Sequence, residues 1–298
     1  MSKKFLLIDG NYLMFQSFYA SYNSKFPNNL LRSPDGRSAN GVHIFLQTFF
    51  KVLKYFKPSH LFVAFDAHGK TKRHELFNEY KSGRNKAPEI IFEQFEIIKE
   101  ILTSMNVKWF EKVGDEADDL IATLATKNKE FDNLIFSKDK DLLQLVNENT
   151  SIIKVLKDKN NFTYYELDTL KNFFENYNIN PFQIPDYKGL AGDSSDNLKG
   201  VNGIGEKKAI SLLNEFNTLE EIYNNIGKLK GKTVEYLLND KENAFFCKKL
   251  AILNKNVEMN NDIDFYAVNI NIQNSFNIFK KFGLNLAAEN LKKIIDDK

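Results

Sequence analysis

The stretch Phe5-Leu6-Leu7-Ile8-Asp9-Gly10 decides the fold. It is a short unbroken apolar run that ends on a carboxylate and is followed by glycine. Such a run is typical of a strand buried on both faces of a parallel sheet. Because ligands of parallel α/β sheets bind beyond the carboxyl ends of the strands, Asp9 stands where a functional group is expected.

The same arrangement recurs twice further along the chain. Asp66 follows the apolar run Leu61–Phe65 directly, and Asp139 and Asp141 come just after Leu134–Phe136. The carboxyl ends of parallel strands lie at one edge of a sheet. The sequence therefore predicts that three separate strands bring carboxylates to the same edge.

The remaining pattern indicates how the chain is divided. A fourth run, Ile152–Leu156, is interrupted by Lys154 and is expected nearer the edge of the sheet. Helical periodicity lies between the strands, and this alternation predicts an α/β fold with a mostly parallel sheet. Beyond about residue 170 the pattern changes to helices joined by turns, so we expect an α/β domain over 1–170 and a helical domain over 171–298. The helices expected between the strands are Val42–Phe56, Pro88–Met105 and Glu116–Lys129.

Composition excludes several classes of protein. Cys247 is the single cysteine among 298 residues, so an intrachain disulfide and a multi-cysteine zinc site are excluded. The apolar run at residues 5–8 is too short for a signal peptide, and no run approaches the length of a membrane span. We expect a soluble, cytoplasmic protein without a membrane partner.

Positive charge is concentrated although the total is nearly balanced. The net charge is 41 − 39 = +2. Residues 70–86 carry six basic side chains against two acidic ones, which are Lys70, Lys72, Arg73, Lys81, Arg84 and Lys86 against Glu75 and Glu79. Such a local excess of cations suits a polyanionic partner better than the overall charge suggests.

Two further groups of acids lie where helices or loops begin. Glu116, Asp118 and Asp119 open a predicted helix, in which Glu116 and Asp119 are spaced i, i+3. Asp193 and Asp196 have the same spacing in a loop. Alone, the first group is more typical of helix capping and the second of a turn. Together with the acids that follow the strands, they give nine carboxylates with a route to one site.

A site of this composition needs cations. Two like charges ~4 Å apart repel by roughly 4 kcal/mol at an effective dielectric constant near 20. Oxygen ligands without histidine or cysteine favour Mg²⁺ or Mn²⁺ over zinc. Two such ions are a common device for hydrolysing phosphodiesters. The acids therefore predict a metal-dependent phosphodiesterase.

Eight segments carry a family resemblance that extends over nearly the whole chain. In this order, they resemble the 5′-nuclease domain of bacterial DNA polymerase I and its relatives, the phage 5′-exonucleases and flap endonucleases. The segments are Leu6-Leu-Ile-Asp-Gly10, Phe65-Asp-Ala67, Arg73-His-Glu75, Tyr80-Lys-Ser-Gly-Arg84, Gly114-Asp-Glu-Ala-Asp-Asp119, Ser137-Lys-Asp-Lys-Asp-Leu142, Gly192-Asp-Ser-Ser-Asp-Asn197 and Gly200-Val-Asn-Gly-Ile-Gly-Glu-Lys207.

The resemblance implies the architecture and the ligand set. It implies a PIN-like, Rossmann-like sheet with a helical arch at about 68–104, followed by a helical domain with a helix-hairpin-helix (H3TH) element at about 190–215. All nine acids match the family's ligands for two Mg²⁺ ions, which Mn²⁺ can replace. The first ion would be held by Asp9, Asp66, Glu116, Asp118 and Asp119, and the second by Asp139, Asp141, Asp193 and Asp196.

The arch would supply catalytic and DNA-binding groups. The segment containing Tyr80, Lys81 and Arg84 resembles the one whose basic residues approach the scissile phosphate. We expect Lys81 and Arg84 to share a helical face and neutralise charge in the transition state. Phe77 and Tyr80 are expected to stack on bases of a single strand. Further DNA contacts are expected from Lys70, Lys72 and Arg73.

The glycine-rich segment would bind duplex DNA. Gly200, Gly203 and Gly205 frame a hairpin in which the backbone can approach a phosphate closely. Relatives bind a potassium ion at this element, so K⁺ is an expected additional ion. The basic residues expected to assist are Lys199, Lys207 and Lys208. Polymerase-linked relatives often have proline where this chain has Lys199.

The resemblance implies a structure-specific 5′-3′ exonuclease and flap endonuclease that removes 5′ flaps and RNA primers in replication and repair. Its partners would be DNA with 5′ flaps, nicks or 5′ ends, RNA primer–DNA hybrids, and a separate DNA polymerase. Because no polymerase sequence follows, we expect a free-standing, monomeric nuclease. Two alternatives stay open: a PIN-domain ribonuclease, and a structure-specific DNA-binding protein without catalysis.

Overall fold

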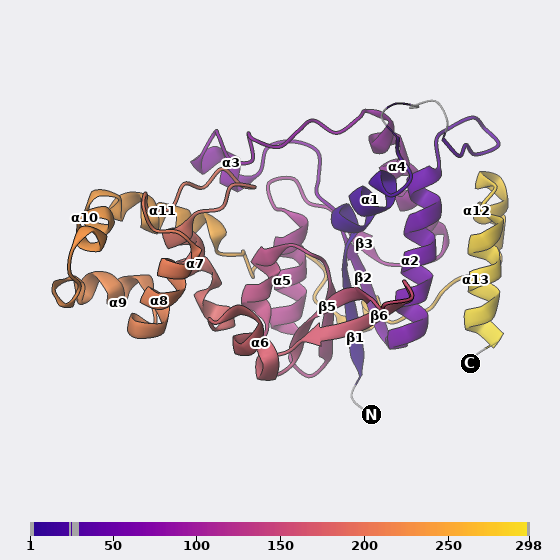
Figure 1. Ribbon diagram of the computed structural model, residues 1–298. Coiled ribbons are helices and arrows are strands. Elements are labelled where there is room, and N and C mark those ends of the chain that lie inside the picture. Colours follow the sequence, from indigo (N-terminus) through magenta and orange to yellow (C-terminus); the bar gives the residue numbers. More distant parts are fainter. Residues whose placement is uncertain (1–2, 24, 26–29, 297–298) are drawn as a thin grey trace.

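A computed structural model describes residues 3–23, 25 and 30–296, and it is built around one six-stranded sheet (Figure 1). The strand order is β3-β2-β1-β4-β5-β6. Strands β1 to β5 are parallel and β6 is antiparallel to β5. The bounds are β1 (Lys4–Asp9), β2 (His60–Ala64), β3 (Trp109–Phe110), β4 (Asp132–Phe136), β5 (Thr150–Lys157) and β6 (Thr163–Asp168).

The four strands expected from the sequence are present, and the prediction of a mostly parallel α/β sheet is confirmed. The order reverses at β1, which has β2 on one side and β4 on the other. A reversal of this kind opens a crevice at the carboxyl ends of the strands, where α/β proteins bind ligands. Asp9 ends β1 at this point.

Helices cover both faces of the sheet. On one face, α1 (Gly10–Tyr19), α2 (Asn40–Phe56) and α4 (Ile90–Ser104) enclose a core that takes Leu6 and Ile8 from β1. On the other, α5 (Ala117–Lys127) packs with Phe5 and Leu7. Alternate residues of a strand point to opposite faces, which is why the run at residues 5–8 is apolar throughout.

The arch expected over 68–104 is too wide. Residues 90–104 form α4, which buries Ile91, Ile98 and Ile101 in the core, so they belong to the layer beside the sheet. The segment 68–89 holds one short helix, α3 (Lys72–Leu76), and turns. Figure 1 shows this segment passing over the carboxyl edge of the sheet.

The second half of the chain is largely helical, but Phe279, Phe282 and Leu291 lie in the core shared with α2, so residues 272–296 are not part of a separate helical domain. Helices α7 to α11 form one end of the molecule, and α12 and α13 lie at the opposite end, where α13 packs against α2 (Figure 1). The bounds are α6 (Leu170–Tyr177), α7 (Ile184–Ala191), α8 (Glu206–Phe216), α9 (Leu219–Asn224), α10 (Lys232–Asn239), α11 (Lys241–Ala251), α12 (Ile272–Phe282) and α13 (Asn285–Asp296). Short 3-10 helices are η1 (Lys140–Leu145), η2 (Pro181–Gln183), η3 (Ile226–Lys228) and η4 (Ile263–Tyr266). No helix within the described ranges is long and apolar enough to cross a bilayer.

Candidate functional site

Asp9 lies at the switch point of the sheet and is almost fully buried. Its Oδ1 accepts a hydrogen bond from the backbone N–H of Tyr12 at 2.8 Å, which caps α1, and its Oδ2 accepts one from the Ser137 hydroxyl at 2.7 Å. Burial, assisted by the charges of Asp66 and Asp139, raises the pKa of Asp9 to about 7. This carboxylate is therefore costly to ionise without a nearby cation.

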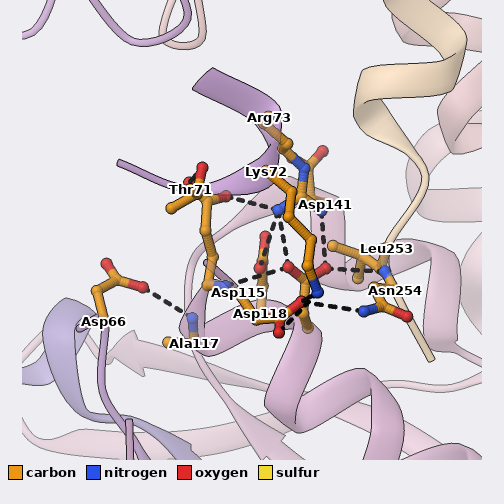
Figure 2. Close-up of polar contacts among 12 residues, drawn as sticks. Asp66, Thr71, Lys72, Arg73, Asp115, Ala117, Asp118, Asp141, Leu253 and Asn254 are labelled. Carbon is orange, nitrogen blue, oxygen red and sulfur yellow. Dashed lines mark hydrogen bonds and ion pairs between the residues drawn. The ribbon is translucent and has the colours of Figure 1, made fainter. Parts of the chain in front are cut away.

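Asp66 is more open to solvent but is firmly oriented. Its Oδ1 accepts from the backbone N–H of Ala117 at 2.7 Å, which Figure 2 shows, and its Oδ2 accepts from the Asn11 amide at 2.9 Å. The Asn11 side chain accepts in return from the backbone N–H of Asp66 at 3.0 Å. Asp66 is thereby placed next to the start of α5, where Glu116 lies.

The acids at the start of α5 surround a buried arginine. Arg73 Nη1 lies 2.7 Å from Glu116 Oε2, and Nη2 lies 2.8 Å from Asp119 Oδ1. Its Nε donates to the carbonyl of Leu250 at 3.0 Å. Arg73 is 8% exposed, so the prediction that it contacts DNA is wrong for this conformation. Five hydrogen-bond acceptors, on four residues, withdraw its guanidinium from solvent and tie the arch to α5 and α11.

Asp118 differs from its two neighbours. Its Oδ1 is buried and accepts no hydrogen bond, and the nearest paired cation is Arg73 Nη1 at 3.7 Å. Burial raises the pKa of Asp118 well above the usual value, although Arg73 opposes the shift. A buried carboxylate oxygen without a hydrogen-bond donor is costly. It fits a role as a ligand of a hard cation.

A lysine joins the acids of the second group. Lys188 in α7 is buried and forms ion pairs with Asp141 and Asp193. Burial opposes its charge, but Asp141 and Asp193 outweigh that effect and raise the pKa of Lys188. In spite of Lys188, burial raises the pKa of Asp141 to about 7. Asp139 Oδ1 accepts from the backbone N–H of Asp141 at 2.9 Å, which keeps these two acids adjacent.

The segment 77–84 of the arch connects the two groups of acids. The Tyr80 hydroxyl lies 3.2 Å from both Glu116 Oε2 and Asp196 Oδ2. Lys81 Nζ lies 2.9 Å from Glu116 Oε1, and Arg84 Nη2 lies 2.9 Å from Asp196 Oδ1. The nine acids therefore lie around one edge of the sheet rather than on separate faces.

Two expectations about this segment are wrong. Lys81 and Arg84 do not share a helical face, because residues 78–83 form turns and Lys81 has a positive φ of 58°. Tyr80 cannot stack on a base here, since its ring is buried and 3% exposed. Phe77 instead packs against Phe246. Both basic residues nevertheless reach the acids from the turn.

The glycine hairpin joins α7 to α8 as expected. Gly200 and Gly203 have positive φ angles of 62° and 83°. A Cβ atom at Gly203 would lie 2.6 Å from the Tyr236 ring, whereas one at Gly205 would meet open space. Lys199 and Lys207 are exposed, and the ammonium of Lys208 lies over the Tyr236 ring at 5.6 Å. Lys70 is also exposed, while Lys72 pairs with Asp115 at 2.8 Å.

The residues fit divalent cations in donor chemistry and charge. The donors are carboxylate oxygens, one of them is a buried oxygen without a hydrogen bond, and basic side chains already lie between the acids. In the described part of the chain, however, no three side chains of His, Cys, Asp or Glu are spaced to hold one ion. Lys81 and Lys188 lie between the acids and hold them in their present positions.

Sequence reasoning missed several residues of the site. Asn11 and Ser137 orient Asp66 and Asp9; Ser137 lies within a segment already matched to the family, and Asn11 directly follows one. Their position in the sequence, next to or near the predicted acids, could have identified them. Lys188 had no such signal, because it lies on a helix between two motifs. Asn254, whose backbone N–H donates to Asp119 at 2.8 Å, lies far beyond any motif.

Two family models and several relatives match most of the chain. The family described as 5′-3′ exonuclease, N-terminal resolvase-like domain, matches residues 4–178, and its C-terminal SAM fold matches residues 179–273. A 5′-3′ exonuclease of Mycoplasmopsis pulmonis is 44% identical over 275 residues, which cover 91% of this chain and 87% of that protein. DNA polymerase I of Bacillus subtilis is 37% identical over 293 residues, which cover 97% of this chain but 32% of the polymerase.

A solved structure of T5 5′-exonuclease with bound zinc ions superposes with a TM-score of 0.64, 21% identity and 99% coverage of both chains, which shows the shared fold. Together with the acid-lined edge of the sheet, these matches define a nuclease with a resolvase-like N-terminal domain. The chain belongs to the 5′-3′ exonuclease family, which includes the flap endonucleases. This membership favours a nuclease over the non-catalytic alternative, and a 5′-nuclease over a PIN-domain ribonuclease.

Proposed function

We propose that this protein hydrolyses phosphodiester bonds of DNA at 5′ flaps, nicks and 5′ ends, acting as a structure-specific 5′-3′ exonuclease and flap endonuclease. The observation that supports this most strongly is the convergence of acids from β1, β2, β4, the start of α5 and the loop 192–197, with the arch above them. The close relative named as a 5′-3′ exonuclease, matched over most of both chains, supports the same activity.

Two Mg²⁺ ions are the proposed cofactors, and Mn²⁺ can replace them. When bound, they would supply the Lewis acidity and the activated water that phosphodiester hydrolysis needs. The proposed ligands of one ion are Asp9, Asp66, Glu116 and Asp118, and those of the other are Asp139, Asp141, Asp193 and Asp196. Asp119 is proposed as a positioning residue, because both its oxygens accept hydrogen bonds from Arg73.

The arch supplies positive charge to the reacting phosphate. Lys81 and Arg84 project from a turn toward the acids, and half of the Arg84 side chain is exposed. With cations held at Glu116 and Asp196, Lys81 and Arg84 would be free to contact a phosphate. They would stabilise the charge that develops on its oxygens. Tyr80 would hold the turn in place from below.

The hairpin binds the duplex without reading its sequence. Its positive-φ glycines let the backbone approach a phosphate, and exposed Lys199 and Lys207 add charge. A K⁺ ion bound by hairpin carbonyls is part of this proposal. The proposed substrates include RNA primer–DNA hybrids, and the proposed role is removal of primers and displaced flaps, in cooperation with a DNA polymerase. A monomer is sufficient, because one chain supplies every group named.

The test is a cleavage ladder on a 5′-labelled flap duplex. We expect short products in lanes with Mg²⁺ or Mn²⁺ and intact substrate in lanes with EDTA. Unstructured RNA of the same length should be cut far more slowly. Equal cutting of both substrates would contradict structure-specific DNA cleavage and favour a ribonuclease, and cutting in EDTA would contradict the metal dependence.

A further inference from the structure

A hollow lies beside the acid site and has no role in the mechanism above. It has a volume of about 340 Å³ and is bounded by the segment 137–140 on one side and by residues 152–156 of β5 on the other. Binding pockets for small molecules start at roughly 300 Å³. Asp139 forms part of its wall, so the hollow opens next to the proposed metal ligands.

The shape of the sheet creates this space. Strand β4 ends at Phe136 and pairs with β5 only as far as Ile152, whereas β5 continues to Lys157 and pairs with β6 throughout. Among the described strands, none pairs with the β4 side of β5 beyond Ile152. In an antiparallel pair, every second residue directs its N–H and C=O away from the partner strand. The wall of the hollow therefore offers backbone donors and acceptors.

Two lysines stand at the rim. Lys138 and Lys140 flank Asp139, both are exposed, and neither pairs with any other side chain in the described ranges. Other basic residues near the site, such as Lys81 and Lys188, are held in ion pairs with acids. Lys138 and Lys140 are therefore available to bind an anion.

The interior suits a flat organic group. Leu143 and Leu156 give the hollow apolar surface, and Tyr177 also lines it. A second hollow of about 250 Å³ shares Lys140, Leu143 and Tyr177 and reaches Asp193 in the proposed metal site. The two hollows therefore lie side by side, one at Asp193 and the other at Asp139 and the unpaired backbone groups of β5.

We infer that this hollow binds a 5′-nucleoside monophosphate, the product released by cleavage. The inference rests on the proposed function. The phosphate lies on Lys138 and Lys140, and the base lies between the apolar walls with its polar edge against the free backbone groups of β5. The product would leave the acids by moving to this neighbouring site.

The experiment is isothermal titration of dTMP and dAMP, with inorganic phosphate as a comparison, into the full chain in EDTA. Removing metal leaves the acid site repulsive to phosphate and so isolates the hollow. We expect both nucleotides to bind more tightly than phosphate alone. The Lys138→Ala/Lys140→Ala double variant should raise the Kd for the nucleotides by at least about tenfold, since each charged contact is worth roughly that factor.

The matched control is Lys129→Ala, which removes an exposed lysine far from the hollow and should leave the Kd unchanged. Unchanged binding in the double variant would overturn the inference. So would equal affinity for phosphate and nucleotides, or loss of binding in Lys81→Ala instead. Flap cleavage by the wild type, measured on the same preparation, separates the two proposals: cleavage without nucleotide binding counts against this inference alone, and absence of cleavage counts against the function.

Discussion

Arg73 holds Asp119 by two parallel contacts, Nη2 to Oδ1 at 2.8 Å and Nη1 to Oδ2 at 2.9 Å. Asp119 Oδ2 also accepts from the backbone N–H of Glu116, which closes the first turn of α5. Both oxygens of Asp119 are thus used to fix the arch to the helix. The pair is buried, so its geometry rather than solvent decides its effect on stability.

Replacing Arg73 with alanine should destabilise the fold rather than weaken DNA binding directly. It leaves Glu116 and Asp119 buried without their partner, and breaking a buried pair in this way costs about 3–5 kcal/mol. Urea unfolding measures the loss. Lys70→Ala, at an exposed residue of the same segment, should change the free energy of unfolding by less than about 0.5 kcal/mol. Equal stability of the Arg73 variant and wild type would contradict this structural role.

Lys188→Met should make the protein depend on divalent cations for stability. The variant leaves Asp141 and Asp193 without their ammonium partner, and Mg²⁺ can take its place. We expect a lower Tm in EDTA and a larger rise in Tm on adding Mg²⁺ than in wild type. The control is Lys248→Met, which also removes a lysine between two acids, Asp186 and Glu220, away from the site. Both variants responding equally to Mg²⁺ would argue against a metal site at Asp141.

Lys81→Met should slow cleavage more than it destabilises the fold, since Glu116 keeps its pair with Arg73 when Lys81 is replaced. Its ammonium reaches Glu116 from a turn, and loss of one group that stabilises transition-state charge costs about 10²–10³-fold in rate. Single-turnover kinetics on a flap duplex measure this. Lys86→Ala, at an exposed arch lysine, should cut within a few-fold of wild type. A loss in Lys86→Ala as large as in Lys81→Met would show that overall arch charge matters, and position does not.

Two glycines of the hairpin provide a matched pair. Gly203→Ala combines a φ of 83° with a Cβ 2.6 Å from the Tyr236 ring, so it should shift the hairpin and weaken binding of duplex DNA. Gly205→Ala meets no neighbour and has an ordinary φ of −90°. It should bind normally in a gel-shift titration with Ca²⁺. Equal binding by both variants would remove the hairpin from the DNA interface.

Much of the sheet could be predicted, because β1 and the strands beside it are apolar on both faces. The positions of Asp9, Asp66 and Asp139 at the carboxyl ends of these strands could be predicted for the same reason. Strand β3 could not be predicted because it has only two residues, and β6 could not because its exposed residues show no clear apolar pattern. Helix α4 was assigned to the arch because sequence shows an amphipathic helix but not what its apolar face packs against.

The contacts of the site were harder to predict than its members. Arg73 lies in a basic segment and reads as a DNA contact, and its burial depends on carbonyls about 180 residues away. The i, i+3 spacing of Lys81 and Arg84 suggested a helix, yet the turn is stabilised by long-range contacts with Ser195 and Asp196. Such tertiary contacts leave no periodic signal in the sequence.

Asp66→Ala tests the central claim most directly, because Asp66 is exposed and its loss should spare the fold, whereas Asp9 is buried. The measurement is paired: single-turnover cleavage of a flap duplex in Mg²⁺ and equilibrium binding of the same duplex in Ca²⁺. The account predicts that cleavage falls by orders of magnitude while binding stays within a few-fold of wild type. Cleavage at the wild-type rate would contradict it.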